Sequence, residues 1–263
     1  RSAIERSSWI RRMFEEGAAL IAEYGAENVF DFTLGNPSVE PPAAFHRELR
    51  RIVEQPDTGM HRYMNNAGYE ETRAAVAKRI AENSGIPVNS SHIIMTCGAG
   101  GALNVTLKTI LNPGEEVIIL TPFFVEYKFY VDNHGGVTTE VWTDPETFQP
   151  DIDAIEAAIT DNTRAIIINS PNNPTGGSPS RDAIDAALAD EQRMVFVDEA
   201  YADFAGESLV HEVEHHANLV VGRSLSKALL ADLRLGYVVA HPQIIGVIEQ
   251  LLTAPYHLSG LQL

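Results

Sequence analysis

Two patterns of apolar and polar positions follow one another along this chain of 263 residues. Up to about residue 83, apolar residues recur at helical spacing, whereas beyond Pro87 short apolar runs alternate with amphipathic segments. The runs at 117–120 and 166–168 are continuously apolar, which is typical of strands buried on both faces. The alternation predicts an α/β fold, with a mostly parallel central sheet and helices on both faces.

The expected elements follow from these patterns and from the turn residues between them. Glycine and proline end most of the segments, and Gly85 is a typical helix terminator. The pattern predicts helices over 7–24, 41–52, 70–83, 102–111, 152–159, 181–189 and 242–252. It predicts strands over 30–34, 92–96, 116–120, 136–142, 165–169, 194–197 and 218–222, with a tight loop at 98–101 and a loop and helix over 121–133.

Composition and charge exclude several classes of partner. Hydrophobic residues make up 44% of the chain, which is enough for a substantial core. A formal charge of −17 argues against nucleic acid and anionic membranes, and no apolar run approaches the ~18 residues of a membrane span. Cys97 is the single cysteine and no export signal is visible, so we expect a reducing, cytoplasmic location. The chain opens at Arg1, and its true start is expected upstream.

The candidate site lies where the strands end, because ligands of open α/β sheets bind beyond the carboxyl ends of the strands. A lysine at the end of a buried strand, Lys227, is a candidate nucleophile, since desolvation favours the neutral amine. Asp198 ends another apolar strand, and a carboxylate there needs a cationic partner. Five segments should gather at this edge: 98–101, 122–124, 170–176, 198–201 and 224–227.

Further groups on the same edge indicate the kind of ligand. The glycine-rich segment 98–101 opens a helix, and a helix N-terminus offers N–H groups to an anion. Phe124 offers a flat apolar face, Asn173 an amide and Tyr201 a phenol. Together with the lysine and the carboxylate, these groups suit a phosphorylated, cationic, planar aldehyde. Pyridoxal 5'-phosphate fits each requirement.

Three motifs give the chain a specific resemblance. The sequences Ser-Pro-Asn-Asn-Pro-Thr-Gly (170–176), Asp-Glu-Ala-Tyr (198–201) and Ser-Leu-Ser-Lys (224–227), the last followed by Leu-Arg-Leu-Gly-Tyr, resemble the signature of class I/II aminotransferases. These are fold-type I pyridoxal-phosphate enzymes, which transfer an amino group between an amino acid and a 2-oxo acid. The chain up to about residue 170 is most similar to bacterial aspartate-aminotransferase-type enzymes, and the part from about residue 190 to histidinol-phosphate aminotransferases. The substrate therefore stays open.

The resemblance implies roles for the residues around the cofactor ring. Lys227 would form the Schiff base and shuttle a proton, and Asp198 would keep the pyridine nitrogen protonated. Asn173 and Tyr201 would hydrogen-bond the phenolic oxygen of the ring, and Phe124 would stack on the ring. Lys227, Asp198 and Tyr201 are thus the expected catalytic residues.

It also implies how the phosphate, the substrate and a second subunit are held. Tyr63 would reach the phosphate of the neighbouring subunit, which makes a homodimer with shared sites the expected assembly. Gly35 and Asn173 would lie near the substrate carboxylate. The phosphate ligands implied are the backbone N–H groups of Ala99 and Gly100, with Ser224 and Arg234.

Two departures from the family pattern bear on these expectations. Seven residues separate Lys227 from Arg234, where the family usually has eight, so the register of the arginine is open. The chain stops where a long helix into a small C-terminal domain would begin, and no residue can be assigned to the arginine that binds the substrate α-carboxylate. We expect residues 1–40 to form an N-terminal helix and arm, and residues 41–263 the cofactor-binding large domain, of a fragment, an engineered reduction or a natural truncation.

Alternative functions remain open at this stage. The segment His-Glu-Val-Glu-His at 211–215 fits the pattern of a zinc protease, although a solvated connecting helix accounts for it better. A scaffold that binds the cofactor with weak or no transaminase activity is a second alternative. Another fold-type I reaction, such as decarboxylation, is a third, because all these enzymes share the same cofactor-binding residues.

Overall fold

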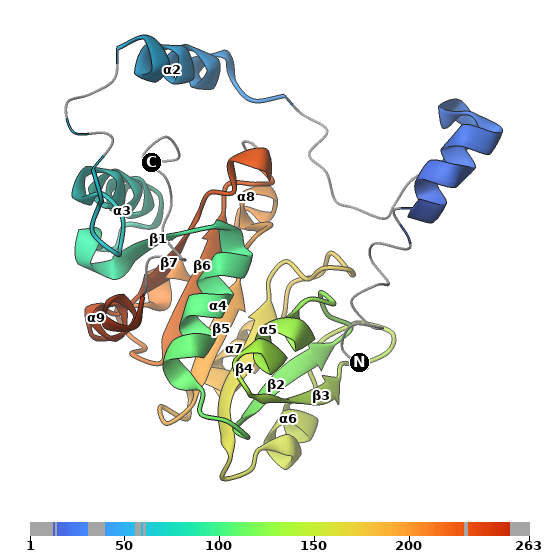
Figure 1. Ribbon diagram of the computed structural model, residues 1–263. Helices are drawn as coiled ribbons and strands as arrows, with labels where there is room; N and C mark the ends of the chain where they lie inside the picture. The colour runs from blue at the N-terminus through green and yellow to red at the C-terminus, as the bar shows by residue number, and fades with distance from the viewer. Residues whose placement is uncertain are drawn as a thin grey trace. The chain divides into compact units, whose positions relative to one another are not determined.

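The computed structural model describes residue 13 and residues 15–30, 40–55, 59, 62–228 and 231–252 (Figure 1). The chain divides into two units, Arg1–Val39 and Glu40–Leu263. In the first unit residues 15–24 are helical and are followed by the short 3-10 helix η1 (Ala26–Asn28). The strand expected at 30–34 lies outside the described residues, except for its first position.

The second unit contains the alternating elements that the sequence pattern predicts. Gly85 ends α3 in the left-handed conformation, and the side chains of Asp151 and Ser180 cap α6 and α7. The helices are α2 (Ala43–Glu54), α3 (Glu70–Ser84), α4 (Gly98–Ile110), α5 (Tyr127–Asn133), α6 (Ile152–Ala158), α7 (Arg181–Leu188), α8 (Ala202–Ala205) and α9 (Pro242–Leu251), with 3-10 helices η2 (Ser90–His92), η3 (Val210–Glu212) and η4 (Ala231–Leu233). The strands are β1 (Ile93–Thr96), β2 (Glu116–Thr121), β3 (Val137–Trp142), β4 (Thr163–Asn169), β5 (Met194–Asp198), β6 (Leu219–Ser224) and β7 (Gly236–Ala240).

These seven strands form one sheet in the order β1-β7-β6-β5-β4-β2-β3. Strand β7 runs antiparallel to β1 and β6, and the other neighbouring strands are parallel. The predicted mostly parallel sheet is thereby confirmed. Asn169 pairs with Asp198, and Asp198 pairs with Gly222, so β4, β5 and β6 approach their carboxyl ends side by side.

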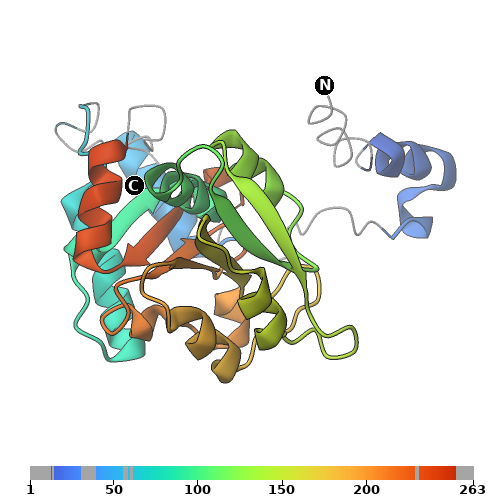
Figure 2. The same cartoon turned by 90° about the horizontal axis from the view of Figure 1, so that it is seen from below.

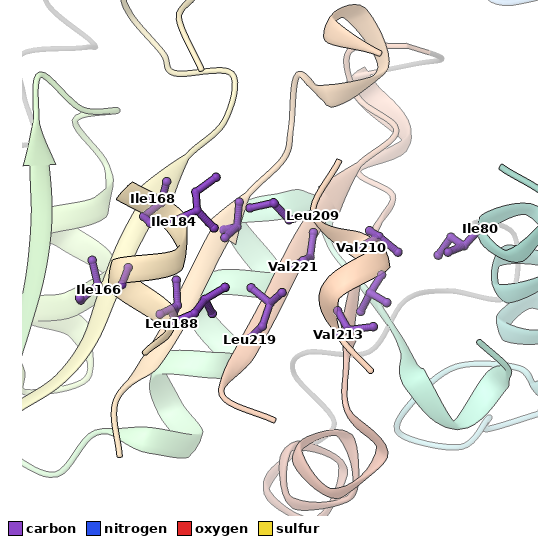
Figure 3. Packing of buried hydrophobic residues seen from close by; sticks show 14 of the residues in the cluster. Ile80, Ile166, Ile168, Ile184, Leu188, Leu209, Val210, Val213, Leu219 and Val221 are labelled. Carbon is purple, nitrogen blue, oxygen red and sulfur yellow. The ribbon is translucent and has the colours of Figure 1, made fainter. Parts of the chain in front are cut away.

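Each face of the sheet has its own hydrophobic core, because side chains alternate between faces along a strand. Figure 2 shows helices on both sides of the sheet. The α4 face packs against α4, α5 and α9, and the α7 face packs against α3, α6, α7 and η3 (Figure 3). The α7-face core includes Ile80, Ile166, Ile168, Ile184, Leu188, Leu209, Val210, Val213, Leu219 and Val221. The α4-face core includes Ala102, Leu103, Val117, Ile119, Tyr127, Ile167, Phe196 and Val220.

Two glycines allow α4 to approach the sheet closely. A Cβ on Gly222 would lie 2.5 Å from the Phe196 ring and 3.4 Å from Ala102 of α4. A Cβ on Gly236 would lie 2.5 Å from the Arg223 carbonyl oxygen and 2.6 Å from the carbonyl carbon of Gly98. Both strand positions therefore exclude any larger residue. The first turn of α4 lies directly against the backbone of β7.

The start of α4 corrects one sequence expectation. Residues 98–101 were expected to form a tight loop that leads into a helix at Ala102, but the helix already begins at Gly98. Gly98 itself has φ of +69°, which glycine adopts without strain, so the chain turns directly from β1 into the helix. Close packing around this turn also leaves little space for a side chain. A Cβ on Gly100 would lie 2.8 Å from the Tyr130 hydroxyl.

Candidate active site

The loop after β4 is attached to the end of β5 by one side chain. Asn169 donates its Nδ2 hydrogen to the carbonyl oxygen of Asp198 at 2.9 Å, and its Oδ1 accepts the backbone N–H of Asn173 at 2.6 Å. The side chain of Asn172 in turn donates to the Pro122 carbonyl oxygen at 3.1 Å. The segments that follow β2, β4 and β5 are thus joined at the carboxyl edge of the sheet, as the sequence predicts.

Asp198 is a buried carboxylate at this edge, 7% exposed. Tyr127 donates its hydroxyl to Oδ2 at 2.7 Å, and the backbone N–H of Ala200 donates to Oδ1 at 3.0 Å. Burial raises the pKa of Asp198 above its ordinary value, while these two hydrogen bonds and the charge of Lys227 act in the opposite direction. The site therefore holds a carboxyl group whose ionisation depends on a nearby positive charge.

Tyr127 is a site residue that the sequence reasoning missed. It lies on α5, its ring is fully buried in the α4-face core, and 71 positions separate it from Asp198. Burial, together with the neighbouring carboxylate, raises the pKa of its hydroxyl, so Tyr127 acts as a hydrogen donor. The only signal in the sequence was a tyrosine three positions after Phe124, and the two rings meet edge to face at 5.7 Å between centroids.

Lys227 and Tyr201 lie together beside this carboxylate. The Nζ atom of Lys227 is 5.2 Å from the centroid of the Tyr201 ring, and Lys227 is half-buried. Its charge is close enough to lower the pKa of Asp198. An amine, a phenol and a buried carboxyl group from β5, β6 and the segments after them therefore share one site.

The N-terminus of α4 offers unpaired backbone donors next to the same strands. Cys97 precedes the helix and provides no side-chain cap, and the first helical hydrogen bond runs from the Gly101 N–H to the Cys97 carbonyl oxygen. Within the described part of the chain, the N–H groups of Ala99 and Gly100 have no hydrogen-bond acceptor. This helix end is thus suited to an anion.

An arginine and a hydroxyl converge on this helix end. A Cβ on Gly98 would lie 3.4 Å from Nη2 of Arg234 and 3.9 Å from Oγ of Ser224. Ser224 is buried and accepts the Ser226 N–H at 3.1 Å, while the buried hydroxyl of Ser226 has no partner among the described residues. We call the α4 N-terminus, Ser224 and Arg234 the anion cradle. Despite the short spacing from Lys227, Arg234 reaches the cradle, and its φ of +52° is a left-handed conformation rare outside glycine.

Comparison with known proteins identifies the family. The model of aminotransferase class I and II matches residues 27–261. The chain belongs to this family. It is 34% identical over 225 residues to the aspartate/prephenate aminotransferase of Thermus thermophilus, a match that covers 81% of this chain and 56% of the relative. It is 36% identical over 161 residues to the histidinol-phosphate aminotransferase of Methanococcoides burtonii, covering 60% of this chain and 44% of the relative.

Solved aminotransferase structures share the fold. An aminotransferase from Eubacterium rectale superposes with a TM-score of 0.88 at 30% identity and covers 100% of this chain and 72% of its own. An aspartate aminotransferase variant from Thermus thermophilus gives a TM-score of 0.86 at 28% identity, covering 97% of this chain and 68% of its own. The chain spans about half the length of the curated relatives it matches. The fold class inferred from the sequence is confirmed as that of fold-type I aminotransferases.

Members of this aminotransferase family use pyridoxal phosphate, and the residues present fit that group. The free N–H groups of α4, the Ser224 hydroxyl and the Arg234 guanidinium form a cradle for a dianionic phosphate. Asp198 provides a buried partner for a cationic ring nitrogen. The cradle therefore fits the phosphate group of pyridoxal phosphate, and Asp198 fits its ring nitrogen.

Four other residues expected at the aminotransferase site differ in their surroundings. Phe124 is half-buried at the edge of the α4-face core, and Asn173 is half-buried in the loop after β4. Tyr63 is 100% exposed in this single chain. Gly35 lies outside the described residues.

The zinc-protease pattern is not supported by the geometry. His211 and Glu212 lie in the 3-10 helix η3, and His215 lies in the turn beyond it, so the α-helical turn that the pattern requires is absent here. Glu212 pairs with Arg181, and Glu214 pairs with the buried His92. No group of three potential metal ligands occurs in the described part of the chain. The expected solvated connecting helix is found in part: it is a short 3-10 helix with exposed His211, while Val210 and Val213 are buried in the α7-face core.

Of the helices that the structure describes, none combines the length and the apolar character needed to cross a membrane.

Proposed function

We propose that this chain is the cofactor-binding part of a pyridoxal-phosphate-dependent aminotransferase that moves an amino group between an amino acid and a 2-oxo acid. One observation carries the proposal: the Lys227 amine, the buried Asp198 carboxyl group and the anion cradle lie at the same edge of one sheet. The relatives named aspartate/prephenate and histidinol-phosphate aminotransferases support the reaction class.

Each residue around the pyridoxal phosphate ring would have its own role. Bound pyridoxal phosphate supplies an electron sink at its protonated ring. Lys227 would hold the cofactor's aldehyde carbon through Nζ and would move a proton with the same atom, for which its half-buried position beside Tyr201 is suited. Asp198 holds the proton on the ring nitrogen. Tyr201 and Asn173 orient the phenolic oxygen of the ring, and Phe124 covers one face.

Binding of the phosphate would rest on the anion cradle. The N–H groups of Ala99 and Gly100 and the Ser224 hydroxyl donate hydrogen bonds, and Arg234 neutralises charge. This arrangement holds the cofactor without contributing to the chemistry, so substitutions here are expected to weaken cofactor binding more than turnover of the loaded protein.

The assembly is a further part of the proposal. We infer a homodimer with shared sites, in which the fully exposed Tyr63 reaches the phosphate bound by the neighbouring subunit. Residues 1–40 would form an arm and residues 41–263 the large domain, and Gly35 and Asn173 stay the proposed contacts of the substrate carboxylate. A cytoplasmic location agrees with the single cysteine. Sedimentation of the loaded protein as a strict monomer would contradict the shared site.

The test of the cofactor assignment is a comparison of two lysine variants. Lys227→Ala should lose the visible absorption of lysine-bound cofactor and should no longer be labelled by the cofactor after borohydride reduction, as measured by intact mass. Lys78→Ala, whose lysine is an exposed residue of α3 in a long 3.9 Å pair with Glu82, should behave like the unaltered protein. A visible band that survives in Lys227→Ala would overturn the assignment.

The reaction itself is tested by a single turnover of the loaded protein. Aspartate, an aromatic amino acid and histidinol phosphate are each mixed with it, and the change in the cofactor spectrum and the 2-oxo product are measured. We expect slow, poorly selective amino transfer. Release of carbon dioxide without a 2-oxo acid would favour a decarboxylase, and binding with no conversion would favour a scaffold.

A further inference from the structure

A buried ion pair lies directly behind the candidate site, on the α7 face of the sheet. The Glu199 side chain is 1% exposed, and its Oε2 atom lies 2.9 Å from Nε of Arg223. Ser208 donates its hydroxyl to the same carboxylate at 2.7 Å, and the Leu209 backbone N–H donates to Oε1 at 2.5 Å. Arg223 also donates from Nη1 to Asp203 of α8 at 3.1 Å. We call Glu199, Arg223 and Asp203 the rear clamp.

The rear clamp is adjacent in sequence to residues of the site but lies on the opposite face. Val195 and Val197 of β5 belong to the α7-face core and Phe196 to the α4-face core, so Asp198 and Glu199 point to opposite faces. On β6, Leu219 and Val221 lie on the α7 face, and the same alternation places Arg223 there and Ser224 on the α4 face. Glu199 and Arg223 are therefore each covalently next to a proposed cofactor ligand, Asp198 and Ser224 respectively.

The clamp joins two strand ends that carry different parts of the site. The end of β5 leads to Asp198 and Tyr201, and the end of β6 leads to Ser224 and Lys227. One backbone hydrogen bond, from the Glu199 N–H to the Gly222 carbonyl oxygen at 2.8 Å, connects them beyond the last paired residues. The guanidinium of Arg223 adds contacts to Glu199 and to Asp203 from two different nitrogen atoms, which a planar fork provides and a lysine does not.

The contribution of the Glu199–Arg223 ion pair to folding stability does not by itself explain why the pair is buried here. Burial raises the pKa of Glu199, and Arg223, the Leu209 N–H and Ser208 act in the opposite direction, so the carboxylate is charged only at the cost of its desolvation. Buried ion pairs are often no more stabilising than apolar residues of the same volume. What the pair does provide is a fixed approach of the two strand ends, because opposite charges on Glu199 and Arg223 are held 2.9 Å apart, although the Arg223 Nε atom makes no aligned hydrogen bond among the described residues.

We propose that the rear clamp is a positioning device that fixes the spacing between Asp198 and the segment 224–227 from behind the sheet. Glu199, Arg223 and Asp203 are positioning residues that touch no cofactor. The inference rests on the proposed function for what the two segments bind, but the coupling between the segments does not require the cofactor.

Two measurements on the full chain test this coupling. Hydrogen exchange of the cofactor-free protein reports the backbone protection of residues 198–201 and 224–228, and titration with pyridoxal phosphate reports affinity. Glu199→Gln keeps the shape of the side chain and removes its charge. The matched control is Glu212→Gln, which removes the charge of another largely buried carboxylate, the partner of Arg181. Arg223→Lys is a milder second variant, for use where Glu199→Gln does not fold.

The expected result is a local and shared effect. In Glu199→Gln and Arg223→Lys, exchange should accelerate in both segments together and not in the β2 and β4 strands, and the dissociation constant for pyridoxal phosphate should rise about tenfold, the size typical of lost supporting contacts. Glu212→Gln should leave both quantities unchanged.

Three other outcomes are informative. Unchanged exchange in 224–228, or exchange that accelerates over the whole sheet, overturns the proposal and leaves an ordinary structural ion pair. An unchanged dissociation constant in Glu199→Gln also overturns it. If the unaltered protein binds no pyridoxal phosphate, the proposed function fails, and the exchange measurement still decides whether the clamp couples the two segments.

Discussion

Replacing Tyr127 by phenylalanine removes one hydroxyl from the site and leaves the ring in the α4-face core. The hydroxyl donates to Oδ2 of Asp198 at 2.7 Å, and after its loss the carboxyl group keeps the Ala200 N–H and the charge of Lys227 among the described residues. The perturbation is therefore confined to the electrostatics of one buried group. It needs no cofactor to be measured.

The magnitude follows from the charge state of Asp198. A hydrogen bond to a charged group contributes about 1.5–3 kcal/mol and one between neutral groups about 0.5–1.5 kcal/mol. Burial raises the folded-state pKa of Asp198 above its ordinary value of 3.8. The stability linked to its neutral form is thus fully present below that value and is lost as the pH rises through the folded pKa. Because Tyr127 favours the ionised form, Tyr127→Phe should raise the folded pKa further and deepen this loss by about 1–1.5 kcal/mol.

Urea unfolding of the cofactor-free protein at constant concentration measures this difference. The free energy of unfolding of Tyr127→Phe and of the unaltered protein is compared between about pH 4 and about pH 8. Tyr130→Phe is the control, because its hydroxyl bonds Glu126 instead of Asp198. The reasoning is refuted if Tyr127→Phe is destabilised by the same amount at both ends of the range, since the hydroxyl would then not distinguish the two charge states of Asp198.

Three further expectations follow from the geometry. Gly236→Ala should lower the free energy of unfolding by about 1–3 kcal/mol, because the new Cβ meets three backbone atoms closer than 3 Å; unfolding curves that match the unaltered protein would contradict the close approach. Arg234→Gly and Arg234→Ala should weaken pyridoxal phosphate binding equally. The free energy of unfolding of the glycine variant should be about 1 kcal/mol higher than that of the alanine variant, since only glycine adopts a φ of +52° without strain. Equal stability of the two variants would argue against the left-handed conformation. Protein purified without a histidine tag should contain no stoichiometric zinc by elemental analysis, and stoichiometric metal would revive the hydrolase alternative.

The fold could be predicted largely from the sequence because the buried strands are short, apolar and separated by turn residues. The ends of β4, β5 and β6 brought Asn173, Asp198 and Ser224 to one edge without any knowledge of contacts. The start of α4 was placed four residues too late, because the close packing at Gly100 and Gly236 that brings the helix against the sheet is visible only in three dimensions.

The supporting residues could not be predicted in the same way. Tyr127 and Asp198 are far apart in the sequence, and nothing in the pattern around α5 distinguishes a tyrosine that serves the site from one that fills the core. The pairing of Glu199 with Arg223 depends on the register of β5 against β6, which hydrophobic runs specify only to within a residue or two. Side chains that act on other side chains leave little trace in a single sequence.

The register between β5 and β6 determines which neighbours the consecutive residues 222, 223 and 224 contact. Gly222 leaves space for the Phe196 ring, Arg223 turns to Glu199 on the α7 face, and Ser224 turns to the anion cradle on the α4 face. A slip of one residue would exchange the two faces, placing the guanidinium against the aromatic core and removing the hydroxyl from the cradle. The glycine and the ion pair both resist that slip, one by sterics and the other by charge. The same contacts that specify the sheet therefore also specify the distance between Asp198 and Lys227.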